Sequence, residues 1–70
     1  MGKPEVNRNK AYSSSEIIAI LKADGWSLHN TEGSHRQFKH PTKKGKVTVK
    51  HPDKDVPGPT VKEIWRQAGL

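Results

Sequence analysis

The side chains of this sequence that can do chemistry at neutral pH are four histidines and a set of lysines that supply most of its basic residues. A histidine takes or gives a proton near neutral pH, and a lysine ammonium group can hold a phosphate and stabilise the charge that develops on it. Such a combination suits cleavage of RNA, because a histidine can activate the ribose 2′-hydroxyl or protonate the leaving oxygen. DNA lacks this hydroxyl, so the chemistry favours RNA.

The histidines do not form a recognisable metal-binding pattern. The sequence has no cysteine and no His-Glu-x-x-His motif, and the strands predicted below bring no acidic residue among the histidines in a ligand geometry. We therefore expect no metal and no other cofactor.

The charge balance narrows the class of partner. Thirteen Lys and Arg stand against seven Asp and Glu, which gives a net charge of +6 and predicts an anionic partner, with nucleic acid first. A membrane is a poor match, because the longest apolar stretch is residues 17–21, and neither a signal peptide nor a spanning helix is predicted. Since cysteine is absent as well, we expect a cytoplasmic protein.

The elements that position these residues begin after a basic segment. Residues 1–12 show no apolar period and are predicted to form a flexible arm, which leaves residues 13–70 as a single domain. Ser13 and Glu16 have the spacing of a capping box. They predict a first helix, which Gly25 ends.

A second helix is predicted near the C-terminus. Thr60 and Glu63 repeat the capping-box spacing, and Gly69 provides the stop. Residues 57–59 are two prolines around a glycine, so they are expected to form a stiff connector without regular structure.

Three strands are predicted between the helices, at residues 26–29, 34–40 and 46–50, with a turn at residues 30–33. Alternation directs five apolar side chains inward, namely Trp26, Leu28, Phe38, Val47 and Val49. It directs seven polar side chains outward, namely Ser27, His29, His35, Gln37, Lys39, Thr48 and Lys50. Two helices covering the inner side give an α+β fold of order αβββα, with a three-stranded antiparallel sheet and both helices on one face.

His35 is expected on the middle strand of the open face, with neighbours on both sides. The predicted register pairs Trp26 with Phe38 and His29 with His35, which makes His29 a candidate helper acid or base. A bulge near Gly33 would reverse the side on which His35 lies. The other two histidines each precede a proline and are interpreted as strand-end residues.

The lysines of the open face, those of the basic loop at residues 42–45 and Lys46 next to that loop are expected to contact RNA phosphates. For the loop the alternative is a solvated surface segment, and on the residues alone an exposed histidine is more often an ordinary surface residue than a catalyst. Beside the catalytic candidate His35, the expected RNA-binding residues are Ser34, Gln37, Lys39, Lys43, Lys44, Lys46 and Lys50.

Several short motifs follow one another along residues 13–70. They are Ile17 to Lys22 with Asp24-Gly25-Trp26, Gly33-Ser34-His35-Arg36-Gln37-Phe38, His40-Pro41-Thr42-Lys43, Val47-Thr48-Val49 with His51-Pro52, and Gln67-Ala68-Gly69-Leu70. In order and spacing they resemble the HicA family of bacterial toxins. The arm at residues 1–12 departs from that family, whose members usually start close to the first helix.

The resemblance implies the fold of a double-stranded-RNA-binding domain and cleavage of messenger RNA. It also implies inhibition by a HicB-type antitoxin, as in type II toxin–antitoxin systems. The family's catalytic histidine, in its Gly-Ser-His step, corresponds to His35, and Gly33 and Ser34 frame it. Two other hypotheses stay open: a non-catalytic RNA-binding module of the same fold, and an interaction domain for an acidic protein.

Overall fold

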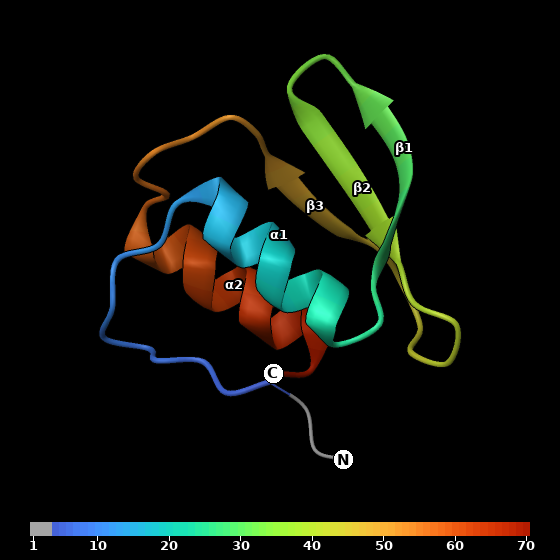
Figure 1. The fold of residues 1–70 in the computed structure, drawn as a ribbon, viewed down its shortest axis with the longest axis horizontal. Coiled ribbons are helices and arrows are strands. Elements are labelled where there is room, and N and C mark those ends of the chain that lie inside the picture. The colour runs from blue at the N-terminus through green and yellow to red at the C-terminus, as the bar shows by residue number, and fades with distance from the viewer. Residues whose placement is uncertain (1–3) are drawn as a thin grey trace.

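The chain folds as one sheet with two helices on one of its faces (Figure 1). The computed structural model describes residues 4–70. Along the chain the elements are α1 (Ser14–Ala23), β1 (Ser27–Glu32), β2 (His35–Lys39), β3 (Val47–Lys50) and α2 (Gly58–Ala68). The strands are antiparallel, in the spatial order β1-β2-β3. The predicted α+β fold of order αβββα, the arrangement of a double-stranded-RNA-binding domain, is confirmed.

Helix α1 begins at the predicted capping box. The Ser13 side chain accepts a hydrogen bond from the Glu16 backbone N–H at 3.2 Å, and the Ser13 N–H donates to the Glu16 carboxylate at 3.0 Å. The hydrogen bonds that the Glu16 carboxylate accepts from the Lys10 ammonium and from the Ser13 backbone N–H lower the pKa of Glu16 to about 2. The helix ends just before Gly25, whose φ of 102° disfavours any residue with a Cβ atom.

Helix α2 begins earlier than predicted. Pro57 is the N-cap, and Gly58 and Pro59 lie in the first turn, so the predicted cap at Thr60 is wrong. A proline is well tolerated there because the first turn leaves its backbone N–H groups without helical partners in any case. Glu63 pairs with Arg66 one turn further on, and this contact lowers the pKa of Glu63.

Tyr12 belongs to the folded core, although the sequence assigned it to the arm. Its side chain is buried, its backbone forms a β-bridge with Val56, and its hydroxyl accepts a hydrogen bond from the Asn7 N–H at 2.9 Å. Arg8 donates to the carbonyl of Leu70, so the predicted arm also contacts the C-terminus. The first part of the predicted arm, residues 1–3, lies outside the described residues.

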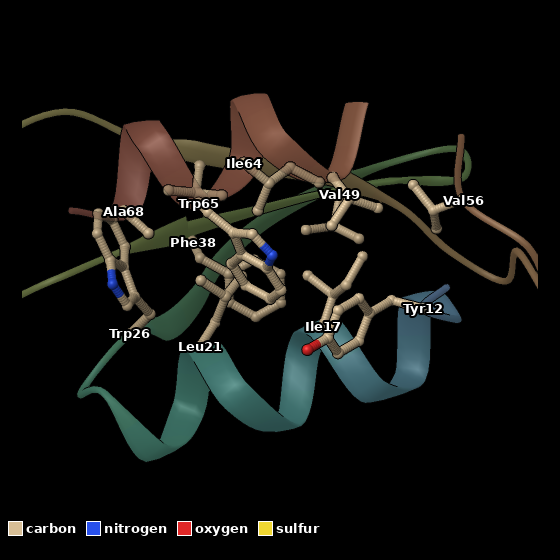
Figure 2. Close-up of a cluster of buried hydrophobic side chains, with 12 residues drawn as sticks. Tyr12, Ile17, Leu21, Trp26, Phe38, Val49, Val56, Ile64, Trp65 and Ala68 are labelled. Carbon is tan, nitrogen blue, oxygen red and sulfur yellow. The ribbon is translucent and has the colours of Figure 1, made fainter. Parts of the chain in front are cut away.

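The core lies between the helices and the inner face of the sheet (Figure 2). Both helices contact β3, and the two tryptophans are the largest side chains in the interior. Tyr12 meets the Trp65 ring edge-on, with 5.5 Å between the centroids. The fully buried core side chains are Ile17, Leu21, Phe38, Val47, Val49, Trp65 and Ala68, and Trp26 is 2% exposed.

The register of the β1–β2 hairpin differs from the prediction. Glu32, not His29, lies opposite His35, because only Gly33 and Ser34 connect the strands. Gly33 has a φ of 57° at the first position of this turn, where two-residue hairpins of type II′ prefer glycine. The residues predicted as a longer turn therefore extend β1, and an irregularity at His29 shifts the register along the strand.

Leu28 faces the inner side of the sheet but does not join the core. It pairs with buried Phe38 across the hairpin, yet it is 48% exposed. Leu28 lines the open groove between α1 and the β1–β2 hairpin, so part of its side chain stays in contact with solvent. The prediction that Leu28 is a core residue is therefore wrong.

Candidate functional site

The outer face of the sheet, which is the face turned away from the helices, is polar along all three strands. Strand β3 shows the parity directly, because Val47 and Val49 are buried whereas Thr48 and Lys50 are exposed. Pairing across the strands extends the outer face to β2 and β1. Its residues are Ser27, Asn30, Glu32, His35, Gln37, Lys39, Thr48 and Lys50.

His35 begins the middle strand and has a charged residue on each side. It pairs with Glu32 of β1 and with Lys50 of β3, so a carboxylate, an imidazole and an ammonium cross the sheet in one row. Directly opposed residues have Cβ atoms about 4.5–5.5 Å apart, which is within reach of these side chains. The bulge is in β1 and leaves the parity of β2 intact, so the predicted outward position of His35 is kept.

The rest of the outer face carries the positive charge expected of a phosphate-binding surface. Lys39 is exposed at the far end of β2. Lys46 lies just before β3 and donates to the Gln37 side-chain oxygen at 3.4 Å, which holds its ammonium over the sheet. Ser34 is exposed in the turn next to His35, and Lys44 is exposed in the β2–β3 loop.

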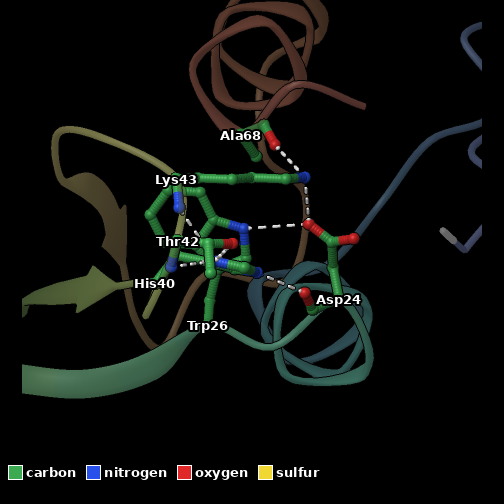
Figure 3. A network of polar contacts seen from close by, with 6 residues as sticks. All are labelled: Asp24, Trp26, His40, Thr42, Lys43 and Ala68. Carbon is green, nitrogen blue, oxygen red and sulfur yellow. Dashed lines mark hydrogen bonds and ion pairs between the residues drawn. The ribbon is translucent and has the colours of Figure 1, made fainter.

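Lys43 has a different environment from its neighbours (Figure 3). Its ammonium forms an ion pair of 2.5 Å with Asp24 and donates to the Ala68 carbonyl at 2.9 Å. Asp24 is 7% exposed and also accepts from the Trp26 indole N–H at 3.1 Å. The prediction that Lys43 binds RNA does not agree with this arrangement, because its charge already joins the ends of α1 and α2 to the β2–β3 loop.

His40 belongs to the same polar network. Its Nδ1 accepts from the backbone N–H groups of Thr42 and Lys43, each at 3.1 Å, which assigns the ring proton to Nε2. Nε2 then donates to the Asp24 carbonyl at 2.7 Å, and the ring meets Trp26 edge-on at 5.3 Å between centroids. A Cβ atom at Gly25 would lie 2.8 Å from Nε2, so glycine is needed there for space as well as for its φ.

His51 is tied to helix α1. Its Nδ1 lies 2.7 Å from the Ser14 hydroxyl, which is buried and also accepts from the Asp53 N–H at 2.8 Å. The backbone of Ser14 donates in turn to the Asp53 carbonyl at 2.8 Å. His51 and His40 therefore each hold two segments of the fold together.

His29 is exposed but does not lie across from His35. The residue falls at the register shift of β1, level with Phe38 and Gln37. At about 3.3 Å per residue along a strand, this separates the two histidines by several ångströms more than the predicted pairing does. The interpretation of His29 as a helper for His35 loses its geometric basis.

Glu32 and Asn30 are residues of this face that the sequence reasoning missed. The Asn30 side-chain amide donates to the Glu32 carboxylate at 3.4 Å, which steadies that group beside His35. The signal that would have found them is Gly33-Ser34 as a two-residue hairpin turn, because this turn alone fixes which residue lies opposite His35.

A groove of about 470 Å³ lies on the other side of the sheet, between α1 and the β1–β2 hairpin. The inner-face residues Leu28, Arg36 and Phe38 form its sheet side. Within residues 4–70, the Nε of Arg36 is buried without a hydrogen-bond partner. Since the groove opens on the face opposite His35, it is not a substrate pocket for that histidine.

Two further properties concern residues 4–70 as a whole. No group of three or more His, Cys, Asp or Glu side chains gathers in a way that could hold a metal ion. None of the helices in this part of the chain has the length and apolar character needed to cross a membrane.

The element order, and the single sheet covered by two helices on one face, define the fold class of the double-stranded-RNA-binding domains. A family model described as the HicA toxin of bacterial toxin–antitoxin systems matches residues 14–70. The chain therefore belongs to the HicA toxin family, and its partner is of the antitoxin kind. No curated protein matches the sequence.

Proposed function

We propose that this toxin is a metal-independent endoribonuclease that cleaves messenger RNA, with His35 as its catalytic histidine. The observation that carries the proposal is the position of His35: exposed, on the middle strand, between Glu32 and Lys50 on a polar face. Membership of the HicA family supports a toxin role for the protein. We assign the activity to the cytoplasm, where messenger RNA is available.

The RNA strand would lie across the outer face of the sheet. Lys50 lies beside His35, whereas Lys39 and Lys46 lie toward the other end of the same face, so successive phosphates can meet ammonium groups as the strand crosses. Ser34 and Gln37 add polar contacts beside them, and Lys44 extends the surface along the loop. Lys43 is left out, because its ammonium is engaged with Asp24 and the end of α2.

Incubation of the purified chain with RNA in excess chelator tests the reaction. We expect the RNA to be cut, because a histidine can transfer the protons and lysines can stabilise the phosphate without a metal. A DNA strand of the same sequence is expected to stay intact because it lacks the attacking hydroxyl. Salt-sensitive binding that leaves the RNA whole would instead identify a non-catalytic RNA-binding module, and cleavage that stops in chelator would refute a metal-free reaction.

The antitoxin is proposed to be of the HicB type and to cover the same basic face. An acidic or extended surface complements the lysines there and blocks access to His35. Expression of the chain is expected to arrest growth, and co-expression of the adjacent antitoxin gene to restore it. The double substitution Lys39→Glu with Lys50→Glu should weaken the complex by roughly tenfold or more in a binding titration. An unchanged affinity would show that the antitoxin binds elsewhere.

A further inference from the structure

We propose that Glu32 is the second proton-transfer group of the site: its carboxylate is the general base and His35 is the general acid. The inference rests on the proposed function and adds to it a residue that neither the family motif nor the sequence pattern marks. It answers a chemical need, because one histidine cannot take one proton and give another in the same step.

The hairpin geometry carries the assignment. Glu32 and His35 flank a two-residue turn and lie directly opposite each other on the outer face, and the short connection leaves little freedom in their spacing. Asn30 donates to one carboxylate oxygen, Oε1, at 3.4 Å. Among residues 4–70 no hydrogen bond occupies the other oxygen, which is thus available to accept a proton.

The charged groups around the pair fit these roles. Lys50 faces His35 from β3, and Lys46 reaches the same face through Gln37. Both ammonium groups are suited to the non-bridging oxygens of a phosphate, whereas neither accepts a proton while it is charged. Glu32 is the acidic residue of this face, so it is the group there that can act as a base when His35 acts as the acid.

The step balances without any other reactant. The Glu32 carboxylate takes the proton of the ribose 2′-hydroxyl, and the 2′-oxygen forms a bond to phosphorus. The bond from phosphorus to the 5′-oxygen breaks, and protonated His35 gives its proton to that oxygen. The products are a 2′,3′-cyclic phosphate and a 5′-hydroxyl, and exchange with water returns both side chains to their starting states.

The test is the pH profile of RNA cleavage by Glu32→Gln. The substitution removes the base while keeping the shape of the side chain, so we expect kcat to fall by roughly 10²- to 10⁴-fold. The KM for RNA should not rise, because a negative charge has left a surface that binds phosphate. The unaltered chain should give a bell-shaped profile of kcat/KM, and the acid limb of the bell should be absent from Glu32→Gln and retained by Glu32→Asp.

Two controls separate this role from charge and from folding. Asp55→Asn makes the same change in net charge in the exposed β3–α2 connection and should leave cleavage unchanged. Urea unfolding of each variant reports its stability, and Glu32→Thr provides a second neutral side chain that suits a strand.

The outcomes also distinguish this inference from the proposed function. If the unaltered chain does not cut RNA, both the proposed function and the role of Glu32 are refuted. A second outcome overturns the role of Glu32 alone. In that case cleavage depends on His35, but Glu32→Gln and Glu32→Thr keep both the rate and the acid limb of the pH profile. A faster reaction in either neutral variant also overturns it, since Glu32 would then only repel the substrate.

Discussion

Replacement of His35 by alanine is expected to reduce RNA cleavage by roughly 10²- to 10⁴-fold, which is the usual contribution of a positioned acid or base. RNA affinity should change little, because the lysines of the outer face supply the phosphate contacts. Stability should stay within about 0.5 kcal/mol of the unaltered chain, since the side chain is exposed and is not part of the core. Single-turnover cleavage in excess chelator, RNA titration and urea unfolding measure the three quantities.

His29→Ala is the matched control for this prediction. His29 is also an exposed histidine of the β1–β2 hairpin, but it lies at the register shift and not opposite His35. Its removal should leave the cleavage rate nearly unchanged. Equal rates for His35→Ala and the unaltered chain would refute the catalytic role, and equal losses for the two variants would show that the hairpin, not one imidazole, is what matters.

The sequence predicts well those parts of the fold that depend on periodic patterns. In α2 the apolar residues that recur at three- and four-residue spacing, Val61, Ile64, Trp65 and Ala68, are all buried. The strict alternation of β3 gave the correct inner and outer sides. For β2 a single apolar residue, Phe38, was enough to assign the inner and outer sides, because the side chains alternate without interruption along the strand. These features are local, so a short stretch of sequence contains all the information that decides them.

The register of the hairpin is decided by a turn and could not be read from periodicity. The predicted pairing of His29 with His35 assumed a long turn, whereas Gly33 and Ser34 close the hairpin alone. In the observed register Glu32, and not His29, lies opposite His35. A carboxylate therefore stands where an imidazole was predicted, which changes the chemistry available to the site. Glu32, which we propose as the second proton-transfer group, was thus missed, although the outward side of His35 was predicted correctly.

The roles of Lys43 and Tyr12 depend on contacts between segments far apart in the sequence. Lys43 belongs to a run of basic loop residues, and nothing local separates it from Lys44. Its ion pair with Asp24 arises only because the loop, the end of α1 and the end of α2 meet in space. Tyr12 likewise lies in a segment without an apolar period and is buried through its bridge with Val56.

His40 illustrates how one residue type serves two purposes in this chain. It has a hydrogen-bond partner for each ring nitrogen, and these partners come from the end of α1 and from the β2–β3 loop. Its loss would leave the Asp24 carbonyl and two backbone N–H groups without their protein partners. A partly buried group deprived in this way typically costs about 1–3 kcal/mol, and water can offset part of this cost near the surface.

His40→Ala is therefore expected to lower the free energy of unfolding by about 2–4 kcal/mol. A domain of this length has roughly 4–10 kcal/mol in total, so the variant should be partly unfolded at growth temperature and lose activity through folding. Urea unfolding followed by the fluorescence of the tryptophans, one of which the His40 ring contacts, measures the change. An unfolding midpoint equal to that of His29→Ala would show that the network around Asp24 does not depend on this imidazole. A variant that folds normally but no longer cuts RNA would instead place His40, and not only His35, in the chemistry.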